Sequence, residues 1–220
     1  MKRKLTKKTD FSEVEINRRN NNAFRGMKIE YEATFINIDK EDIRKKLQKS
    51  GAKLTKPEFL QKRVVFNLPK GHEIKGGWLR VRDEVDKITM SLKVIDGDKI
   101  ENQKEICVEV DNFQQAELLL TAIGCQKKSY QETKREIWAL ENVEITIDEW
   151  PFLEPFVEIE GNSESAVKKT AEKLGFNYKE ALFCATDLLY NKKYGIPFAA
   201  INKISKLTFD GPNPFTTKNE

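Results

Sequence analysis

Like charges recur two positions apart in three short segments of this 220-residue chain. The segments are "IEYE" at 29–32, "WLRVR" at 78–82 and "FVEIE" at 156–160. In a β-strand, residues two apart point to the same face of the sheet. Each segment would therefore place two like charges on one face and aliphatic or aromatic side chains on the other. The acidic pairs are Glu30 with Glu32 and Glu158 with Glu160, and the basic pair is Arg80 with Arg82.

Two explanations fit such pairs. The charged faces could lie in water and pair across strands as Arg–Glu contacts, which requires no ligand. Alternatively, the acids could bind a metal ion and the bases a phosphate chain. The candidate bases are Arg80, Arg82, Lys93 and Arg135, and the candidate acids are Glu30, Glu32, Glu105, Asp148, Glu158 and Glu160. This set carries an excess of two negative charges. Two divalent cations would turn it into an excess of two positive charges, which suits a polyanion such as triphosphate.

The sequence contains few of the residues that other kinds of active site or metal site require. One histidine, His72, makes a His-based zinc site or a Ser-His-Asp triad improbable, and carboxylate ligands favour Mg²⁺ or Mn²⁺. The three cysteines, Cys107, Cys125 and Cys184, form no Cys-x-x-Cys pair, which favours a reduced, cytoplasmic protein. A net charge of +4 gives no argument for nucleic acid. No apolar run reaches the roughly 20 residues that span a bilayer, and no apolar stretch follows the basic N-terminus as a secretory signal requires.

The elements that would position these residues are mostly short strands. Alternating segments bounded by Gly, Pro, Asn or Asp predict about eight strands, and four helical segments lie among them, the last over 179–195. This pattern predicts an antiparallel α+β fold with a large sheet or a barrel. We expect residues 1–26 to be a disordered basic tail, residues 27–195 to form one domain, and residues 196–220 to be a loosely attached extension.

The order of these motifs resembles a known family. "IEYE", "WLRVR", "KREIW", "ITIDEWP" and "FVEIEG" occur in the order of the CYTH domain. This is the triphosphate tunnel metalloenzyme superfamily, which includes class IV adenylate cyclases, thiamine triphosphatases and inorganic tripolyphosphatases. The resemblance covers roughly residues 27–195. It implies an antiparallel eight-stranded β-barrel that forms a tunnel with charged side chains pointing inward, flanked by helices.

The resemblance also implies roles for the charged residues. It implies a divalent-metal-dependent hydrolase of a triphosphate, with Mg²⁺ or Mn²⁺ as cofactor. The resemblance does not decide whether the chain forms a homodimer. A class IV-type adenylate cyclase and a non-catalytic triphosphate- or polyphosphate-binding module are the alternatives. By resemblance, the substrate-binding residues are Arg80, Arg82, Lys93 and Arg135. The metal-binding residues are Glu30, Glu32, Glu158 and Glu160, with Glu105 and Asp148 as further acidic positions, and Glu30 and Glu32 would act through the metal and the positioning of water.

Two positions depart from the family pattern. The lysine of the family's Glu-x-Glu-x-Lys signature falls on Thr34, and a threonine cannot supply a cation or a basic amine. The acid expected two residues after Glu105 is replaced by Cys107, which we expect to be a small buried core residue. The first departure puts turnover in question, and both departures are the reason to keep the binding module as an alternative.

Overall fold

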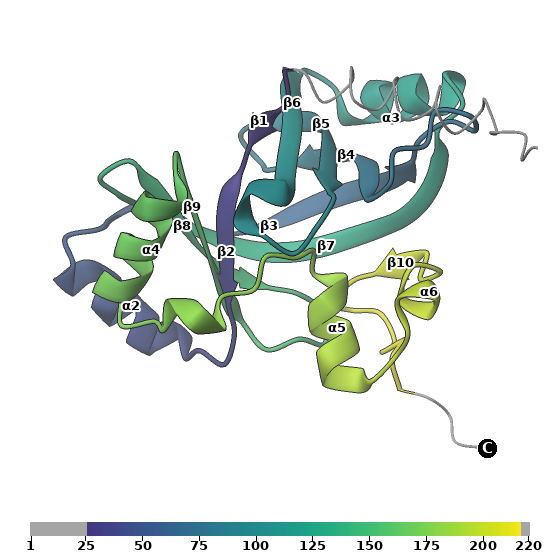
Figure 1. The fold of residues 1–220 in the computed structure, drawn as a ribbon. Coiled ribbons are helices and arrows are strands. Elements are labelled where there is room, and N and C mark those ends of the chain that lie inside the picture. Colours follow the sequence, from purple (N-terminus) through teal and green to yellow (C-terminus); the bar gives the residue numbers. More distant parts are fainter. Residues whose placement is uncertain (1–25, 217–220) are drawn as a thin grey trace, which may run out of the picture.

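The computed structural model describes residues 26–216, whose arrangement is shown in Figure 1. The disorder expected for residues 1–26 therefore concerns residues that, apart from Gly26, lie outside the described range. The strands are β1 (Lys28–Ile29), β2 (Tyr31–Phe35), β3 (Lys53–Asn67), β4 (Gly77–Asp83), β5 (Ile88–Ile95), β6 (Gln103–Val110), β7 (Gln126–Leu140), β8 (Val143–Glu149), β9 (Phe156–Gly161) and β10 (Lys206–Leu207). The α-helices are α2 (Lys40–Lys49), α3 (Phe113–Ala122), α4 (Glu164–Lys173), α5 (Asp187–Tyr194) and α6 (Phe198–Ile201). Within 26–216, none of the helices combines the length and the apolarity needed to cross a membrane.

The strands form a nearly closed antiparallel barrel. Their order is β1-β6-β5-β4-β3-β7-β8-β9-β2, so β1 and β2 lie at the two ends of the path. Because these two strands are separated by Glu30 alone, they form one interrupted strand that pairs with β6 at its start and β9 further on. Counted this way, the wall has eight strands, and the predicted eight-stranded α+β barrel is confirmed.

Helices cover the outside of one half of the barrel. On β9, Val157 and Ile159 are fully buried and point outward, in the same hydrophobic cluster as Leu47 of α2 and Val167 of α4. The intervening Glu158 and Glu160 point to the opposite side, into the barrel. The alternation seen in the sequence thus separates an apolar layer beneath the helices from a charged lumen.

A second apolar cluster lies between α3 and the other half of the barrel. Val64 and Phe66 of β3 and Val81 of β4 are essentially fully buried there, together with Ala116 and Leu120 of α3. Arg63 and Arg82 alternate with these residues on the same strands. Both halves of the barrel therefore hold their charged residues inside by burying the neighbouring residues outside.

The fourth helix predicted from the sequence is shorter than expected. The sequence predicts a helix over 179–195, but α5 begins at Asp187 and follows a 3₁₀ turn at Tyr178–Glu180. Between them, Leu182 forms an isolated bridge to β2, where its backbone and that of Thr34 exchange hydrogen bonds of 2.9 and 3.0 Å. These hydrogen bonds to a strand edge replace the helical bonds that the local sequence favours.

The C-terminal segment packs against the barrel. Its β10 pairs in parallel with β7, and Phe215 is 3% exposed. The Phe215 ring stacks on Tyr190 and Tyr194 of α5 at centroid distances of 4.2 and 5.1 Å. The loose attachment expected for 196–220 is therefore wrong as far as the structure describes it, because aromatic residues beyond the expected boundary fill a hydrophobic cluster with Trp150.

Candidate active site

The barrel encloses a cavity of about 730 Å³. Nine of the ten charged residues singled out in the sequence line it, and the tenth, Asp148, is fully buried behind one of them, Arg135. The nine are Glu30, Glu32, Arg80, Arg82, Lys93, Glu105, Arg135, Glu158 and Glu160. These residues come from seven different strands or strand breaks, and the closure of the barrel brings them together.

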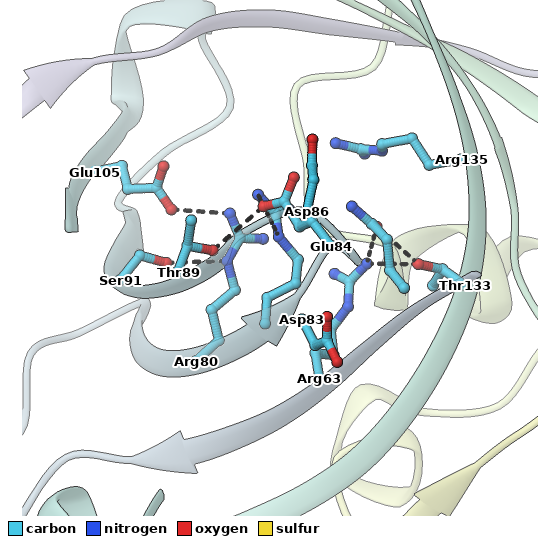
Figure 2. Close-up of polar contacts among 12 residues, drawn as sticks. Arg63, Arg80, Asp83, Glu84, Asp86, Thr89, Ser91, Glu105, Thr133 and Arg135 are labelled. Carbon is cyan, nitrogen blue, oxygen red and sulfur yellow. Dashed lines mark hydrogen bonds and ion pairs between the residues drawn. The ribbon is translucent and has the colours of Figure 1, made fainter. Parts of the chain in front are cut away.

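One ion pair in the cavity joins β4 to β6 across β5. The Nη2 of Arg80 lies 2.9 Å from Glu105 Oε1, and its Nε donates to Ser91 Oγ at 3.0 Å (Figure 2). Burial alone would raise the pKa of Glu105, but the charge of Arg80, a hydrogen bond with Glu30 and the charge of Lys93 together outweigh burial, and the pKa falls to about 2. Glu105 is therefore ionised and is the acid partner of Arg80.

A lysine lies between the first two glutamates. The Nζ of Lys93 is 2.9 Å from Glu30 Oε2, as an ion pair rather than an aligned hydrogen bond, and 3.5 Å from Glu32 Oε1. Burial opposes the charge of Lys93, but Glu32 and Glu30 hold its pKa above the ordinary value. Burial raises the pKa of Glu30 to about 7 despite Lys93, and the adjacent carboxyl of Glu105 adds to the rise. The single charge of Lys93 thus does not fully compensate the two carboxyl groups of Glu30 and Glu32.

On the adjoining wall, one arginine likewise contacts two acids. Arg135 of β7 donates to both oxygens of Asp148 at 2.7 and 2.9 Å and to Glu158 Oε2 at 2.6 Å. Although Arg135 favours the carboxylate form of Glu158, burial and the charges of Glu32 and Asp148 outweigh it and raise the pKa of Glu158 to about 8. Burial, followed by Glu32, also raises the pKa of Glu160. We therefore expect Glu158 to be mostly protonated at neutral pH.

The donor set suits a hard divalent cation. Its acids offer oxygen ligands, and burial, together with neighbouring carboxyl groups, raises the pKa values of Glu30, Glu158 and Glu160, so a bound cation would stabilise their carboxylate forms. No three metal-ligating side chains in the described part of the chain already converge on one point. The acids contact Lys93 and Arg135 instead, so binding a cation would require them to turn away from these partners.

The two departures from the family pattern lie on the same strands as the site. Thr34 is 3% exposed and is in register with Glu158 across β2 and β9. Cys107 is exposed and lines the cavity two residues beyond Glu105, so the expectation of a buried core position for it is wrong. The alternation of β6 explains this, because an inward Glu105 requires an inward Cys107.

The structure adds charged residues that the sequence reasoning missed. Arg63 of β3 is in register with Arg82 and lines the cavity, and Glu84 pairs with Arg82 at 2.7 Å. Glu84 could have been found by continuing the alternation of "WLRVR" by two residues. Arg63 has no like charge two positions away, so the criterion of paired charges could not find it. Aromatic residues Trp150, Tyr190 and Phe215 form a further part of the cavity wall.

Comparison with known proteins agrees with this fold. Solved structures with the same fold include a protein from Pyrococcus horikoshii OT3 (24% identity, TM-score 0.60, covering 71% of this chain and 96% of that one). They also include a conserved hypothetical protein from Pyrococcus furiosus (21%, 0.59, 71% and 96%) and a candidate adenylate cyclase from Vibrio parahaemolyticus (10%, 0.64, 74% and 97%). No curated protein matches the chain. The family model described as the CYTH domain matches residues 27–188, and the chain therefore belongs to the CYTH domain family.

Proposed function

We propose that this protein is a divalent-metal-dependent hydrolase of a triphosphate, either inorganic tripolyphosphate or an organic triphosphate such as thiamine triphosphate or a nucleoside triphosphate. The observation that carries the proposal is the enclosure of Arg80, Arg82, Lys93 and Arg135 in one cavity with the acids Glu30, Glu32, Glu105, Glu158 and Glu160. Membership of the CYTH family supports it. Because the bases lie inside a cavity, the partner they suit is a small polyanion rather than a nucleic acid or a membrane surface.

The bases would hold the phosphate chain. Arg135 donates to Asp148 through a guanidinium edge, and the same edge of Arg80 donates to Ser91 and Glu105; a guanidinium edge also suits two phosphate oxygens. A triphosphate entering the cavity would accept from the guanidinium N–H groups that Glu105 and Asp148 leave open, while these two acids keep Arg80 and Arg135 in place. Because the guanidinium groups are already held in place, little ordering is needed when the ligand arrives.

The acids would hold Mg²⁺ or Mn²⁺. Glu30, Glu32, Glu158 and Glu160 are the proposed ligands, with Glu105 and Asp148 as acidic neighbours that stay with Arg80 and Arg135. The bound ion would supply Lewis-acid stabilisation of the terminal phosphoryl group and orient a water molecule. Protonated Glu158 would have to lose its proton to become a ligand, which couples metal binding to pH.

Phosphate release tests the proposal. The protein is incubated with tripolyphosphate, thiamine triphosphate or ATP, in Mg²⁺, Mn²⁺ or EDTA, and we expect release from at least one of the three with metal and none in EDTA. Arg80→Ala should reduce kcat/KM by about 10²- to 10³-fold, because it removes a charge-assisted contact to the phosphates. Lys62→Ala, on the exposed face of β3, is the matched control and should leave it unchanged. No release under any of these conditions would contradict hydrolysis.

One observation favours adenylate cyclase as a second candidate. Trp150, Tyr190 and Phe215 line the same cavity as the phosphate-binding candidates and could stack on a nucleobase. A cyclase would convert ATP to cyclic AMP and pyrophosphate, and mass spectrometry of an ATP reaction distinguishes this product from ADP and inorganic phosphate. Cyclic AMP as the main product would replace the hydrolase assignment.

Thr34 supports a third candidate, a triphosphate- or polyphosphate-binding module without turnover. A buried threonine stands where the family signature has a lysine, so a cation beside the phosphates is missing at this position. Calorimetry that shows tight tripolyphosphate binding, with no product after long incubation with either metal, would establish this function instead. The three cysteines are free thiols, which suits the cytoplasmic location that we propose for any of the three functions.

A further inference from the structure

Arg63 is a buried arginine without an acid partner. It is 6% exposed, and its Nη2 donates to Thr133 Oγ1 at 2.9 Å and to Gln61 Oε1 at 3.3 Å (Figure 2). Its Nε has no hydrogen-bond partner. The other three arginines of the cavity pair with Glu105, Glu84 and Asp148, whereas no carboxylate within residues 26–216 lies within ion-pair distance of Arg63.

The surroundings of Arg63 are positive. It is in register with Arg82 on the neighbouring strand, and Figure 2 shows it in the same group of side chains as Arg80 and Arg135. Burial, followed by the charges of Arg82, Arg80 and Arg135, lowers the pKa of Arg63 well below its ordinary value. A buried charge that only neutral groups contact destabilises a folded protein unless a ligand compensates it.

The position of Arg63 places this unmatched charge at one end of the arginine cluster. Its guanidinium carbon lies 4.6 Å from the centroid of the Trp150 ring, and Trp150 packs edge-on against Tyr190. Both aromatic residues line the cavity, as Arg63 does. Arg63 therefore lies between the other arginines and the aromatic wall to which Phe215 of the C-terminal segment contributes.

We propose that Arg63 forms, with Arg82 and Arg135, a subsite for one phosphoryl group of the bound chain, at the end of the cavity next to Trp150. This inference rests on the proposed function, because it takes a triphosphate as the ligand. The anion supplies the negative charge that Arg63 lacks, and its oxygens accept from the unpartnered Nε. Thr133 and Gln61 fix the orientation of the guanidinium but leave its charge uncompensated.

The experiment separates binding from a structural role. Arg63→Gln keeps a side chain that can donate to Thr133 but removes the charge, and Arg63→Met removes both. Lys62→Met is the matched control, because Lys62 is the exposed neighbour on the same strand. For each protein, the Tm without ligand is measured by calorimetry, and the Kd for tripolyphosphate is measured by isothermal titration in Mg²⁺ and in EDTA.

We expect both Arg63 variants to match or exceed the Tm of the unchanged protein without ligand, because they remove an unpaired buried charge. We expect their Kd for tripolyphosphate to rise at least tenfold, and that of Lys62→Met to stay the same. If Arg63→Met does not fold, Arg63→Gln carries the test alone.

Two results would overturn the inference in different ways. A lower Tm with an unchanged Kd in the Arg63 variants would make Arg63 a structural residue and leave the proposed function intact. Failure of the unchanged protein to bind tripolyphosphate in either buffer would remove the proposed function and this subsite together. Arg80→Ala in the same titration tells the two apart, because it should weaken binding whenever the cavity takes the phosphate chain, whatever Arg63 does.

Discussion

Arg135 and Asp148 face each other across β7 and β8 and form a two-hydrogen-bond pair of 2.7 and 2.9 Å inside the barrel. Asp148 is fully buried, and Thr146 Oγ1 also donates to it at 2.6 Å. The same guanidinium contacts Glu158 of β9, so a single arginine joins three adjacent strands. This pair organises the wall on which the acidic half of the site is built.

Removal of Arg135 should therefore destabilise the empty protein. Arg135→Met leaves Asp148 buried without its cation, which typically costs about 3–5 kcal/mol in the free energy of unfolding. Urea unfolding at pH 7 measures the change. Lys134→Met is the control, because Lys134 is partly exposed and its 3.4 Å contact with Glu149 lies near the surface, where a pair contributes about 1 kcal/mol or less. Equal effects of the two substitutions would show that Arg135 does not stabilise the barrel.

Metal binding should release protons at neutral pH. The pKa of Glu158 is about 8 and that of Glu30 about 7, so at pH 7 the first is mostly protonated and the second about half. A divalent cation binds the carboxylate form, and on the order of one proton should leave per metal site. Release should disappear by about pH 9, where both acids are already ionised, and metal affinity should rise as the pH rises toward that point.

Calorimetric titration of Mn²⁺ in buffers with different heats of ionisation measures this proton count. Glu158→Gln should lower the number of protons released and weaken Mn²⁺ binding. Glu164→Gln, at the start of α4 and away from the cavity, should change neither quantity. Metal binding without proton release at pH 7 would mean that these acids are not the ligands.

Restoring the missing cation at Thr34 should speed turnover. Thr34 lies two residues beyond Glu32 and is in register with Glu158, so a lysine there would enter the acidic part of the site. Thr34→Lys should raise kcat/KM for the triphosphate substrate about tenfold, which is what one added charge-assisted contact provides. Thr34→Met, of similar length but neutral, is the control. A rate that is no higher in Thr34→Lys than in Thr34→Met would show that another step limits the reaction.

Phe215 should be needed for stability. Its ring is buried against Tyr190 and Tyr194, and Phe215→Ala should reduce the free energy of unfolding by about 3 kcal/mol or more. Phe198→Ala is the control, because Phe198 is 43% exposed and its loss should cost less than about 1 kcal/mol. Urea unfolding measures both changes. An effect of Phe215→Ala as small as that of Phe198→Ala would indicate that the C-terminal segment detaches in solution.

The inward-facing charges could be predicted because strand alternation is a local property. Glu158 and Glu160 are separated by one apolar residue in the sequence, and the pleat alone places them on one face. Their partners could not be predicted in this way. That Lys93 contacts Glu30 and Glu32 depends on how β5, β6 and the interrupted first strand close the barrel, which brings together residues about 60 positions apart.

Arg63 and the segment before α5 show where such local reasoning ends. Lys62 is equally basic but exposed, and nothing in the local sequence distinguishes the buried Arg63 from it, because burial here is decided by which face of β3 forms the lumen of the barrel. Likewise, Leu182 lies in a helix-compatible sequence but bonds to Thr34, nearly 150 residues earlier in the chain. A distant strand edge that offers free backbone groups can override local helix propensity, and no window of sequence contains that information.

The seam of the barrel links assembly to recognition. The interrupted first strand joins β6 on one side and β9 on the other, and it carries Glu30 and Glu32. A chain whose cylinder has not yet shut therefore has no complete site. Any ligand that contacts these two glutamates and the far side of the barrel at once links the strands that close the barrel. Its binding free energy therefore stabilises the closed barrel against opening at this strand. Slower hydrogen exchange at the amides of the first strand in the presence of ligand would show this stabilisation before any product is measured.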